Sequence, residues 1–259
     1  MSSDNPIRQS FNRAATSYAA TARLQRQVAE QLVRELHAEL PSDFAGTLLD
    51  AGCGTGYCLT QLAAYYPAAT VLGLDFASAM LQTLPPETAH CRINGDLQHL
   101  PLANSSIDLY VSSLAWQWCH LNQAIAEAAR VLKPGAQLWL ATLAADTFHE
   151  LQDTLYDAGL TPSAHLLAPT EKTQVLDAFQ QSPLHVITAR CDTLTTFHPD
   201  FATLRRSIRG VGANRLPASA QEPISRVARQ RLIEAYEVRR TSHGLPLSYH
   251  VLTIHAQRI

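Results

Sequence analysis

Hydrophobic residues recur every four positions near the beginning of the chain, at Leu24, Val28, Leu32, Leu36 and Leu40. This spacing predicts an amphipathic helix over residues 20–40, with the arginines of this segment largely off the apolar stripe. Pro41 and Ser42 then end the helix. From there to about residue 158, short apolar segments alternate with helical patterns. That alternation is typical of a parallel sheet with helices on both faces.

Two later segments, residues 185–197 and 248–257, are rich in β-branched residues and predict a sixth and a seventh strand. About fifty residues lie between them, and a minimal sheet does not need them. Apolar positions there predict a short helix at Phe201, Leu204 and Ile208, and a longer one at Ile224, Val227, Leu232, Ala235 and Tyr236. We expect this insertion to stand above a ligand site and close it as a lid.

Composition fits one large domain, because 259 residues with 46% hydrophobic content can bury a full α/β core. The sequence has no run of eighteen apolar residues and no secretory signal, so we expect no membrane span. The five cysteines are odd in number and have no C-x-x-C spacing. They are typical of a reduced cytoplasmic protein and indicate neither a disulfide set nor a zinc site.

Charge is distributed unevenly along the chain. Residues 41–200 carry a balance of −10, whereas residues 201–259 carry +7, and eighteen of the twenty basic residues are arginine. Arg205 with Arg209, and Arg226 with Arg229, are placed at helical spacing. Arginine favours bidentate contact with carboxylate or phosphate, so this segment is either a recognition surface for an acidic partner or an ordinary solvated face.

The candidate chemistry begins at residues 48–56, Leu-Leu-Asp-Ala-Gly-Cys-Gly-Thr-Gly, which are followed by Asp75 at the end of a second predicted strand. Alternate glycines let the backbone lie flat against a ligand, and the acid can accept both hydroxyls of a ribose. We therefore expect a nucleoside site, the alternative being a tight turn without a ligand. A pyrophosphate fingerprint would need glycine at position 57, where this chain has Tyr57.

The glycine segment, with Asp50 before it, resembles motif I of the class I S-adenosylmethionine (SAM) methyltransferases. Residues 71–81, 93–97, 105–113 and 130–138 resemble the later motifs of that family, in the same order. The resemblance implies a Rossmann-like α/β fold with seven strands, the last antiparallel, and SAM as cofactor without a metal. It also implies that the cofactor is bound by Tyr18, Asp50, Gly52, Gly54, Asp75, Phe76, Met80, Asp96, Leu97 and Leu114. Met80 has an alternative reading as an ordinary core residue.

Three further segments resemble the malonyl-(acyl carrier protein) O-methyltransferases of biotin synthesis: residues 11–26, 114–118 and 207–214. The chain departs from that family at residues 207–209, where leucine and lysine are expected and Ser-Ile-Arg stands instead. The resemblance implies an N-terminal helical cap at 1–42, a SAM-binding core at 43–198, a helical lid at 199–247 and a final core strand at 248–259. It also implies acyl carrier protein as partner, without nucleic acid or membrane, and a monomer.

Methylating a carboxylate needs no general base, because the acceptor is already ionised at neutral pH. The protein must hold the carboxylate oxygen about 3 Å from the methyl carbon, in line with the departing sulfur, and exclude water. Expected catalytic residues are Tyr18, Trp116 and Gln117, although one of Trp116 and Trp118 should be a core aromatic. Expected substrate-binding residues are Arg205, Arg209 and Asn214, and expected partner-binding residues are Arg23, Arg26, Arg206, Arg226 and Arg229.

Two alternatives stay open at this stage. The acceptor could be another small carboxylic acid or a quinone precursor, for which an arginine-rich segment has less purpose. A binding module that holds a nucleoside without turnover would bind the cofactor and transfer no methyl group.

Overall fold

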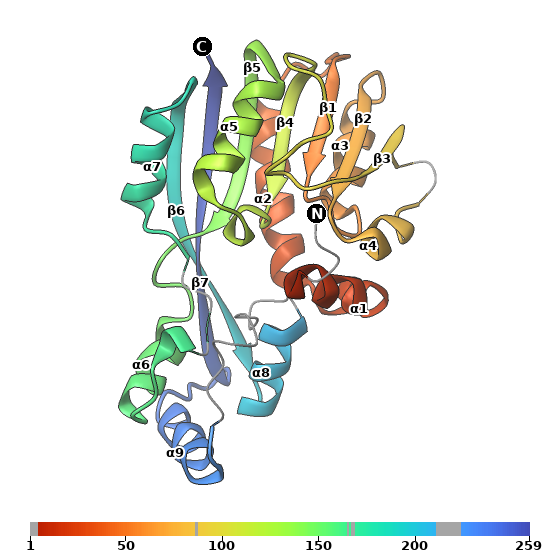
Figure 1. Ribbon diagram of the computed structural model, residues 1–259. Helices are drawn as coiled ribbons and strands as arrows, with labels where there is room; N and C mark the ends of the chain where they lie inside the picture. The colour runs from red at the N-terminus through yellow and green to blue at the C-terminus, as the bar shows by residue number, and fades with distance from the viewer. Residues whose placement is uncertain (1–4, 86–87, 165, 167–168, 211–223) are drawn as a thin grey trace.

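The computed structural model describes residues 5–85, 88–164, 166, 169–210 and 224–259. Its centre is a seven-stranded sheet in the order β3-β2-β1-β4-β5-β7-β6 (Figure 1). The strands are β1 (Thr47–Ala51), β2 (Thr70–Asp75), β3 (Cys91–Asn94), β4 (Ile107–Ser113), β5 (Leu132–Leu143), β6 (Leu184–His198) and β7 (Leu245–Arg258). The helices are α1 (Pro6–Thr21), α2 (Arg23–Glu39), α3 (Tyr57–Tyr65), α4 (Ser78–Gln82), α5 (Leu121–Val131), α6 (His149–Asp157), α7 (Lys172–Gln180), α8 (Phe201–Gly210) and α9 (Arg226–Glu237), with 3-10 turns η1 (Trp116–Trp118) and η2 (Pro162–Ala164).

The topology confirms the predicted Rossmann-like seven-stranded sheet. Strands β1 to β5 pair in parallel, and β7 runs antiparallel to both of its neighbours, β5 and β6. In β1, Leu49 is level with Leu72 of β2 and with Tyr110 of β4, and all but the first residue of the strand are buried. A central parallel strand is covered on both faces, which is why its sequence is a continuous apolar run.

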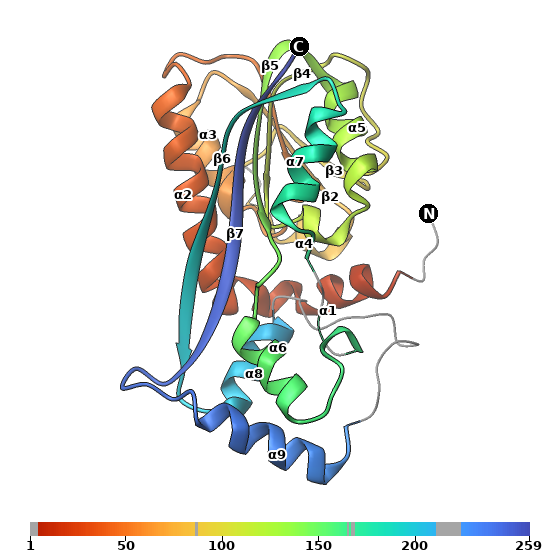
Figure 2. The ribbon, with the colours of Figure 1, turned by 90° about the vertical axis from the view of Figure 1, so that its left-hand side faces the viewer.

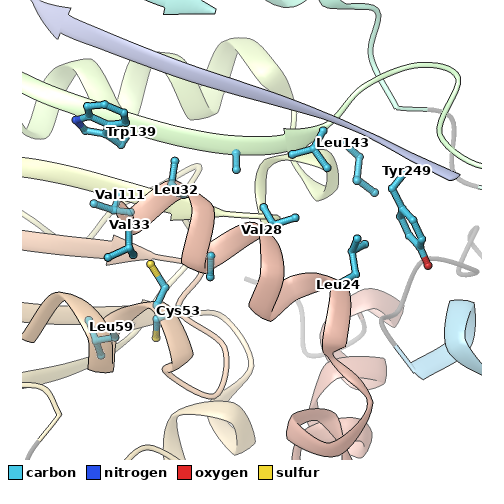
Figure 3. Close-up of a cluster of buried hydrophobic side chains, with 14 of the residues drawn as sticks. Leu24, Val28, Leu32, Val33, Cys53, Leu59, Val111, Trp139, Leu143 and Tyr249 are labelled. Carbon is cyan, nitrogen blue, oxygen red and sulfur yellow. The ribbon is translucent and has the colours of Figure 1, made fainter. Parts of the chain in front are cut away.

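Two helical layers cover the sheet. Helices α2 and α3 pack on one face, and α5 and α7 pack on the other (Figure 2). Leu24, Val28 and Leu32 of α2 point toward Trp139 and Leu143 of β5 (Figure 3). The predicted apolar stripe is therefore the buried face of α2, and burial of such side chains contributes about 1.5–3 kcal/mol each.

The helix predicted over residues 20–40 is α2, which begins at Arg23, whereas residues 20 and 21 end a separate helix, α1. Ala22 has φ −82° and ψ 45°, so helix α1 ends before it and α2 begins after it. Helix α1 lies across the end of the sheet where β1 and β2 finish, and α2 runs along the sheet face (Figures 1 and 2). The backbone conformation of Ala22 is what turns the chain from one direction to the other.

Strands β6 and β7 continue past the rest of the sheet as a two-stranded ribbon (Figure 2). Pairing reaches His198 opposite Leu245, so both strands are longer than the segments 185–197 and 248–257 predicted for them. Helices α6, α8 and α9 pack beside this ribbon, and Glu150 of α6 accepts a bond from the Ser248 amide at 3.0 Å. The buried side chains of the two insertion helices include Phe201, Leu204, Ile208, Leu232 and Tyr236.

Val227, which the sequence pattern placed with the apolar face of the insertion, is 63% exposed. Ile224 is 38% exposed, so the buried face of α9 begins later, at Leu232. Among the helices that the structure describes, none combines the length and apolar character that crossing a bilayer requires.

Candidate active site

A cavity of about 440 Å³ opens at the carboxyl ends of β1 and β2. Its walls come from the loop between β1 and α3, the ends of β2, β3 and β4, and the helices α1 and α2. Ligand sites of open α/β sheets lie at this position, next to the strand pair where the order of the sheet reverses. The cavity therefore stands where the glycine motif predicted a ligand.

The glycine turn is shaped by three residues in the left-handed region, Gly52 (φ 82°), Gly54 (φ 54°) and Gly56 (φ 82°). A Cβ on Gly52 would come within 2.4 Å of the Ala115 Cβ, and one on Gly56 within 2.0 Å of Leu84. At Gly54 no described atom lies within 4 Å of such a Cβ, so a side chain there would project into the open cavity. The turn thus leaves a flat stretch of backbone facing a ligand.

Asp75 holds this turn in place from the end of β2. Its carboxylate accepts hydrogen bonds from the amides of Gly54 at 2.9 Å and Ala77 at 2.8 Å. Burial, with only 6% of the residue exposed, raises the pKa of Asp75 to about 6, although both amide bonds oppose the shift. Asp75 therefore shapes the loop and also presents a buried carboxylate to the cavity.

Asp50, at the end of β1, is fully buried and lines the same cavity. Burial, and next the nearby charge of Asp75, raise the pKa of Asp50 to about 7. The Leu59 amide lies near enough to oppose this rise, but neither carboxylate oxygen forms a hydrogen bond of normal distance and angle with a described residue. An unpartnered buried carboxylate is costly, so this position suits a ligand that brings a cation or hydrogen-bond donors.

Two glutamines also have buried polar atoms in this cavity that lack partners among the described residues. The Oε1 atom of Gln25 in α2 and the Nε2 atom of Gln61 in α3 are buried, line the cavity and lack partners within the described part of the chain. The cavity thus offers a carboxylate, an amide acceptor and an amide donor. That set matches the ammonium and carboxylate groups of an amino acid.

Aromatic rings from α1 and from the strand ends meet on the outer side of the cavity. Phe11 lies 6.2 Å from Tyr18, 6.0 Å from Phe76 and 5.8 Å from Trp118, measured between ring centroids. Met80 is buried in this cluster together with Ala15 and Ala77. Burial, and next the charge of Asp75, raise the pKa of Tyr18, so its hydroxyl stays protonated at neutral pH. This cluster covers the cavity with apolar surface.

The structure brings together all of the residues expected to bind the cofactor, because each of them lines the cavity. They are Tyr18, Asp50, Gly52, Gly54, Asp75, Phe76, Met80, Asp96, Leu97 and Leu114. Among them, the Asp96 carboxylate accepts a bond from the Gln98 backbone amide at 2.9 Å. Their individual roles toward a ligand stay predictions.

The two other expected catalytic residues lie elsewhere. Trp116 is 3% exposed and stacks on Phe179 at 6.1 Å, so it packs in the core and does not line the cavity. The Gln117 side chain donates to the Leu114 carbonyl at 2.8 Å and is also outside the lining. Trp118 faces the cavity instead, as the aromatic partner of Phe11.

The expected substrate- and partner-binding residues are spread over several helices. Arg205 is half-buried on α8, whereas the Arg209 side chain and Asn214 lie outside the described residues. The arginines expected to meet a partner are all exposed: Arg23, Arg26, Arg206, Arg226 and Arg229.

Arg26 borders the cavity and lies 5.2 Å above the Tyr57 ring. No described residue of α8 or α9 lines the cavity, so the lid stays a prediction, and the observed cover is helix α1. Within the described ranges, no group of three histidine, cysteine or acidic side chains could hold a metal ion.

Comparison with known proteins agrees with this geometry. Residues 49–140 match a family described as "Methyltransferase domain". The malonyl-(acyl-carrier protein) O-methyltransferase of Dechloromonas aromatica is 41% identical over 97% of this chain and 94% of its own length. The enzyme of the same name from Herminiimonas arsenicoxydans is 35% identical over 96% and 94%.

A solved structure supports the fold independently. Geranyl diphosphate C-methyltransferase of Streptomyces coelicolor, in complex with Mg²⁺, geranyl diphosphate and S-adenosyl-L-homocysteine, superposes with a TM-score of 0.55. That match covers 92% of this chain and 80% of the other at 17% identity, which is evidence for the fold alone. On the near full-length relatives and the matched domain, the chain belongs to the malonyl-(acyl-carrier protein) O-methyltransferases, within the class I SAM-dependent methyltransferases.

Proposed function

We propose that this enzyme transfers the methyl group of SAM to the free carboxylate of a malonyl thioester carried by acyl carrier protein. The observation that supports the proposal most is the coincidence of the buried, unpartnered Asp50 with the glycine turn in one cavity. The identity of the acceptor is supported by the near full-length relatives, which are named for this reaction. The methyl ester would remove the charge from the malonyl end, which suits a chain that starts pimeloyl synthesis for biotin.

The residues present fit the cofactor. Asp50, Gln25 and Gln61 suit the ammonium and carboxylate of its methionine end, because their buried polar atoms lack partners among the described residues. Asp75 suits the ribose hydroxyls and Asp96 the adenine side, since both line the same cavity beyond the glycine turn. When bound, SAM supplies an electrophilic methyl group on a sulfonium.

The protein's own contribution to the step is placement and exclusion of water. A carboxylate acceptor needs no proton removed, so no residue has to act as a base. The Tyr18 hydroxyl, kept protonated by its raised pKa, can donate to the acceptor carboxylate and orient it. Phe11, Phe76 and Trp118 form the apolar cover that keeps water from the reacting atoms.

Carrier recognition would use the exposed arginines. Arg226 and Arg229 on α9 are exposed, and their side chains form no hydrogen bond or ion pair with the described residues. Arg23 and Arg26 stand on α2 close to the cavity. An acidic carrier protein would be attracted to both groups, and such exposed charges act mainly on the rate of encounter. We further propose that the enzyme acts as a monomer in the cytoplasm.

A methyl-transfer assay with malonyl-carrier protein, malonyl-coenzyme A and free malonate, side by side, tests the proposal. We expect the highest kcat/KM with the carrier protein, a lower value with coenzyme A and little transfer to malonate. Binding of SAM without transfer to any of the three would contradict the proposed reaction. Equal rates with all three would contradict the role given to the arginines.

A further inference from the structure

Helix α4 begins without a cap of its own. The first turn of a helix leaves backbone amides unpaired, and a serine, threonine, aspartate or asparagine before the helix normally accepts one of them. The residue at that position here is Ala77, which has no side-chain acceptor. The Oδ1 atom of Asn12, sixty-seven residues earlier in the chain, accepts the hydrogen bond of the Ala79 amide at 3.0 Å. Asn12 of α1 thus caps α4 from a distance.

The capped segment forms part of the cofactor site. Residues 75–80 run from Asp75, which supports the glycine turn, to Met80, which lines the cavity. Asn94 holds the beginning of this segment from β3, with bonds to the carbonyls of Asp75 at 2.9 Å and Phe76 at 3.1 Å. The Asp75 carboxylate holds Ala77, and Asn12 holds Ala79. Asp75 and Asn94 belong to strands of the sheet, whereas Asn12 belongs to helix α1.

Helix α1 is attached to the rest of the protein in a way that makes this contact useful. It joins α2 through Ala22, which is outside the helical region, and it lies across the end of the sheet (Figures 1 and 2). Phe11, the neighbour of Asn12, is the ring that contacts Tyr18, Phe76 and Trp118. Ala15, one turn further along, packs with Ala77 and Met80. Asn12 therefore adds a hydrogen bond to the apolar contacts that Phe11 and Ala15 make with this segment.

We infer that Asn12 is a positioning residue that fastens α1 over the cofactor and, in the same contact, completes α4. The hydrogen bond forms only when α1 lies on the site and Ala79 is correctly placed. The placement of α1 over the cavity and the ordering of residues 75–80 are therefore coupled. This inference rests on the proposed function only in taking the cavity to be the cofactor site.

The test compares Asn12→Ala with Asn12→Asp, which keeps an oxygen acceptor for the Ala79 amide. A side-chain-to-backbone bond of this kind corresponds to about three- to tenfold in an equilibrium constant. We expect Asn12→Ala to raise the Kd for S-adenosyl-L-homocysteine by about that factor, measured by calorimetry. We also expect it to weaken the protection that this ligand gives to the backbone amides of residues 6–21 in hydrogen exchange. Asn12→Asp should retain both properties to within about twofold.

Gln31→Ala is the matched control, because the Gln31 side chain bonds only to Glu35 among the described residues and does not line the cavity. It should leave the Kd and the exchange of α1 unchanged. Native affinity and native protection of α1 in Asn12→Ala would overturn the inference, as would equal losses in Asn12→Ala and Asn12→Asp. A lowered melting temperature with an unchanged Kd would show that Asn12 only stabilises the fold. If the native protein does not bind the ligand, the proposed function fails instead.

Discussion

The unpartnered carboxylate of Asp50 makes cofactor binding depend on pH. Its pKa is raised to about 7, mainly by burial. An ammonium group placed beside it would favour the ionised form and lower that pKa. Binding therefore removes a proton from Asp50 whenever the site begins protonated, and affinity must fall as the pH falls through about 7. We therefore expect cofactor binding to weaken when the pH is lowered from about 7.5 to about 6.

The size of the effect follows from the pKa of Asp50 in the empty enzyme. With a pKa of about 7, the apparent Kd is multiplied by 1 + 10^(7 − pH), which is about 11 at about pH 6 and about 1.3 at about pH 7.5. The ratio is about eightfold, or about 1.3 kcal/mol. Asp75, with a pKa of about 6, should add a factor of about two if the ribose hydroxyls bind its ionised form.

The same shift carries a stability effect with a defined sign. Folding raises the pKa of Asp50 and Asp75 above the ordinary value near 4, so these two groups bind more protons in the folded enzyme than in the unfolded chain. Their contribution to stability should therefore decrease as the pH rises from about 4 to about 7. The increase in melting temperature caused by the ligand should be larger at about pH 7.5 than at about pH 6.

Titration calorimetry with S-adenosyl-L-homocysteine is the assay, since this ligand keeps the amino acid end and lacks the sulfonium charge. Runs in two buffers of different ionisation enthalpy give the proton release, which at about pH 6 should be about 0.9 per site from Asp50 alone and about 1.4 if Asp75 also ionises. Asp50→Asn is the control. Its Kd should change by at most about twofold between about pH 7.5 and about pH 6, which is the contribution of Asp75. An affinity of the native enzyme that is independent of pH, with no proton release, would refute the assignment of Asp50 to the ammonium site.

Four further outcomes are expected. Asp75→Ala should weaken SAM binding by about 1.5–3 kcal/mol in calorimetry, and an unchanged affinity would remove Asp75 from the site. Tyr18→Phe should lower kcat while the melting temperature stays within a few degrees; a large loss of stability with normal activity would make Tyr18 an anchor of α1. Replacing Arg226 and Arg229 together by glutamate should raise KM for malonyl-carrier protein more than for malonyl-coenzyme A, and equal increases would argue against carrier docking. Gly56→Ala should lower the melting temperature, because φ is 82° and the added Cβ meets Leu84 at 2.0 Å; a native melting temperature would contradict that geometry.

The cofactor cavity could be predicted from the sequence because its residues are tied to local backbone requirements. The glycines at 52, 54 and 56 adopt positive φ, and Asp75 ends a strand whose register is fixed by β1. Such features depend on neighbours close in the chain, so their spacing survives in the sequence as a recognisable pattern. The same holds for the apolar stripe of α2, which follows the helical period.

The features that could not be predicted from the sequence depend on contacts between distant parts of the chain. Nothing in the residues around Ala22 marks a helix end, since no glycine or proline stands there, and the break is fixed by how α1 and α2 pack. Trp116 and Trp118 belong to one 3-10 turn, and their residue type alone does not reveal that Trp118 lines the cavity while Trp116 packs against Phe179. Pro246 lies outside the segment 248–257 predicted as a strand, yet it pairs opposite Phe197 within the ribbon.

The position of β7 has a consequence for the order in which the molecule can assemble. This strand comes after every other strand along the chain, yet it lies between β5 and β6 and supplies the inner partner to both. During synthesis, β1 to β5 and their helices can associate while β6 still has no strand to pair with. The ribbon, and the helices α8 and α9 that pack beside it, must therefore wait until residues 245–258 leave the ribosome. The half of the protein that holds the nucleoside can thus form before the half that carries the arginines of α9.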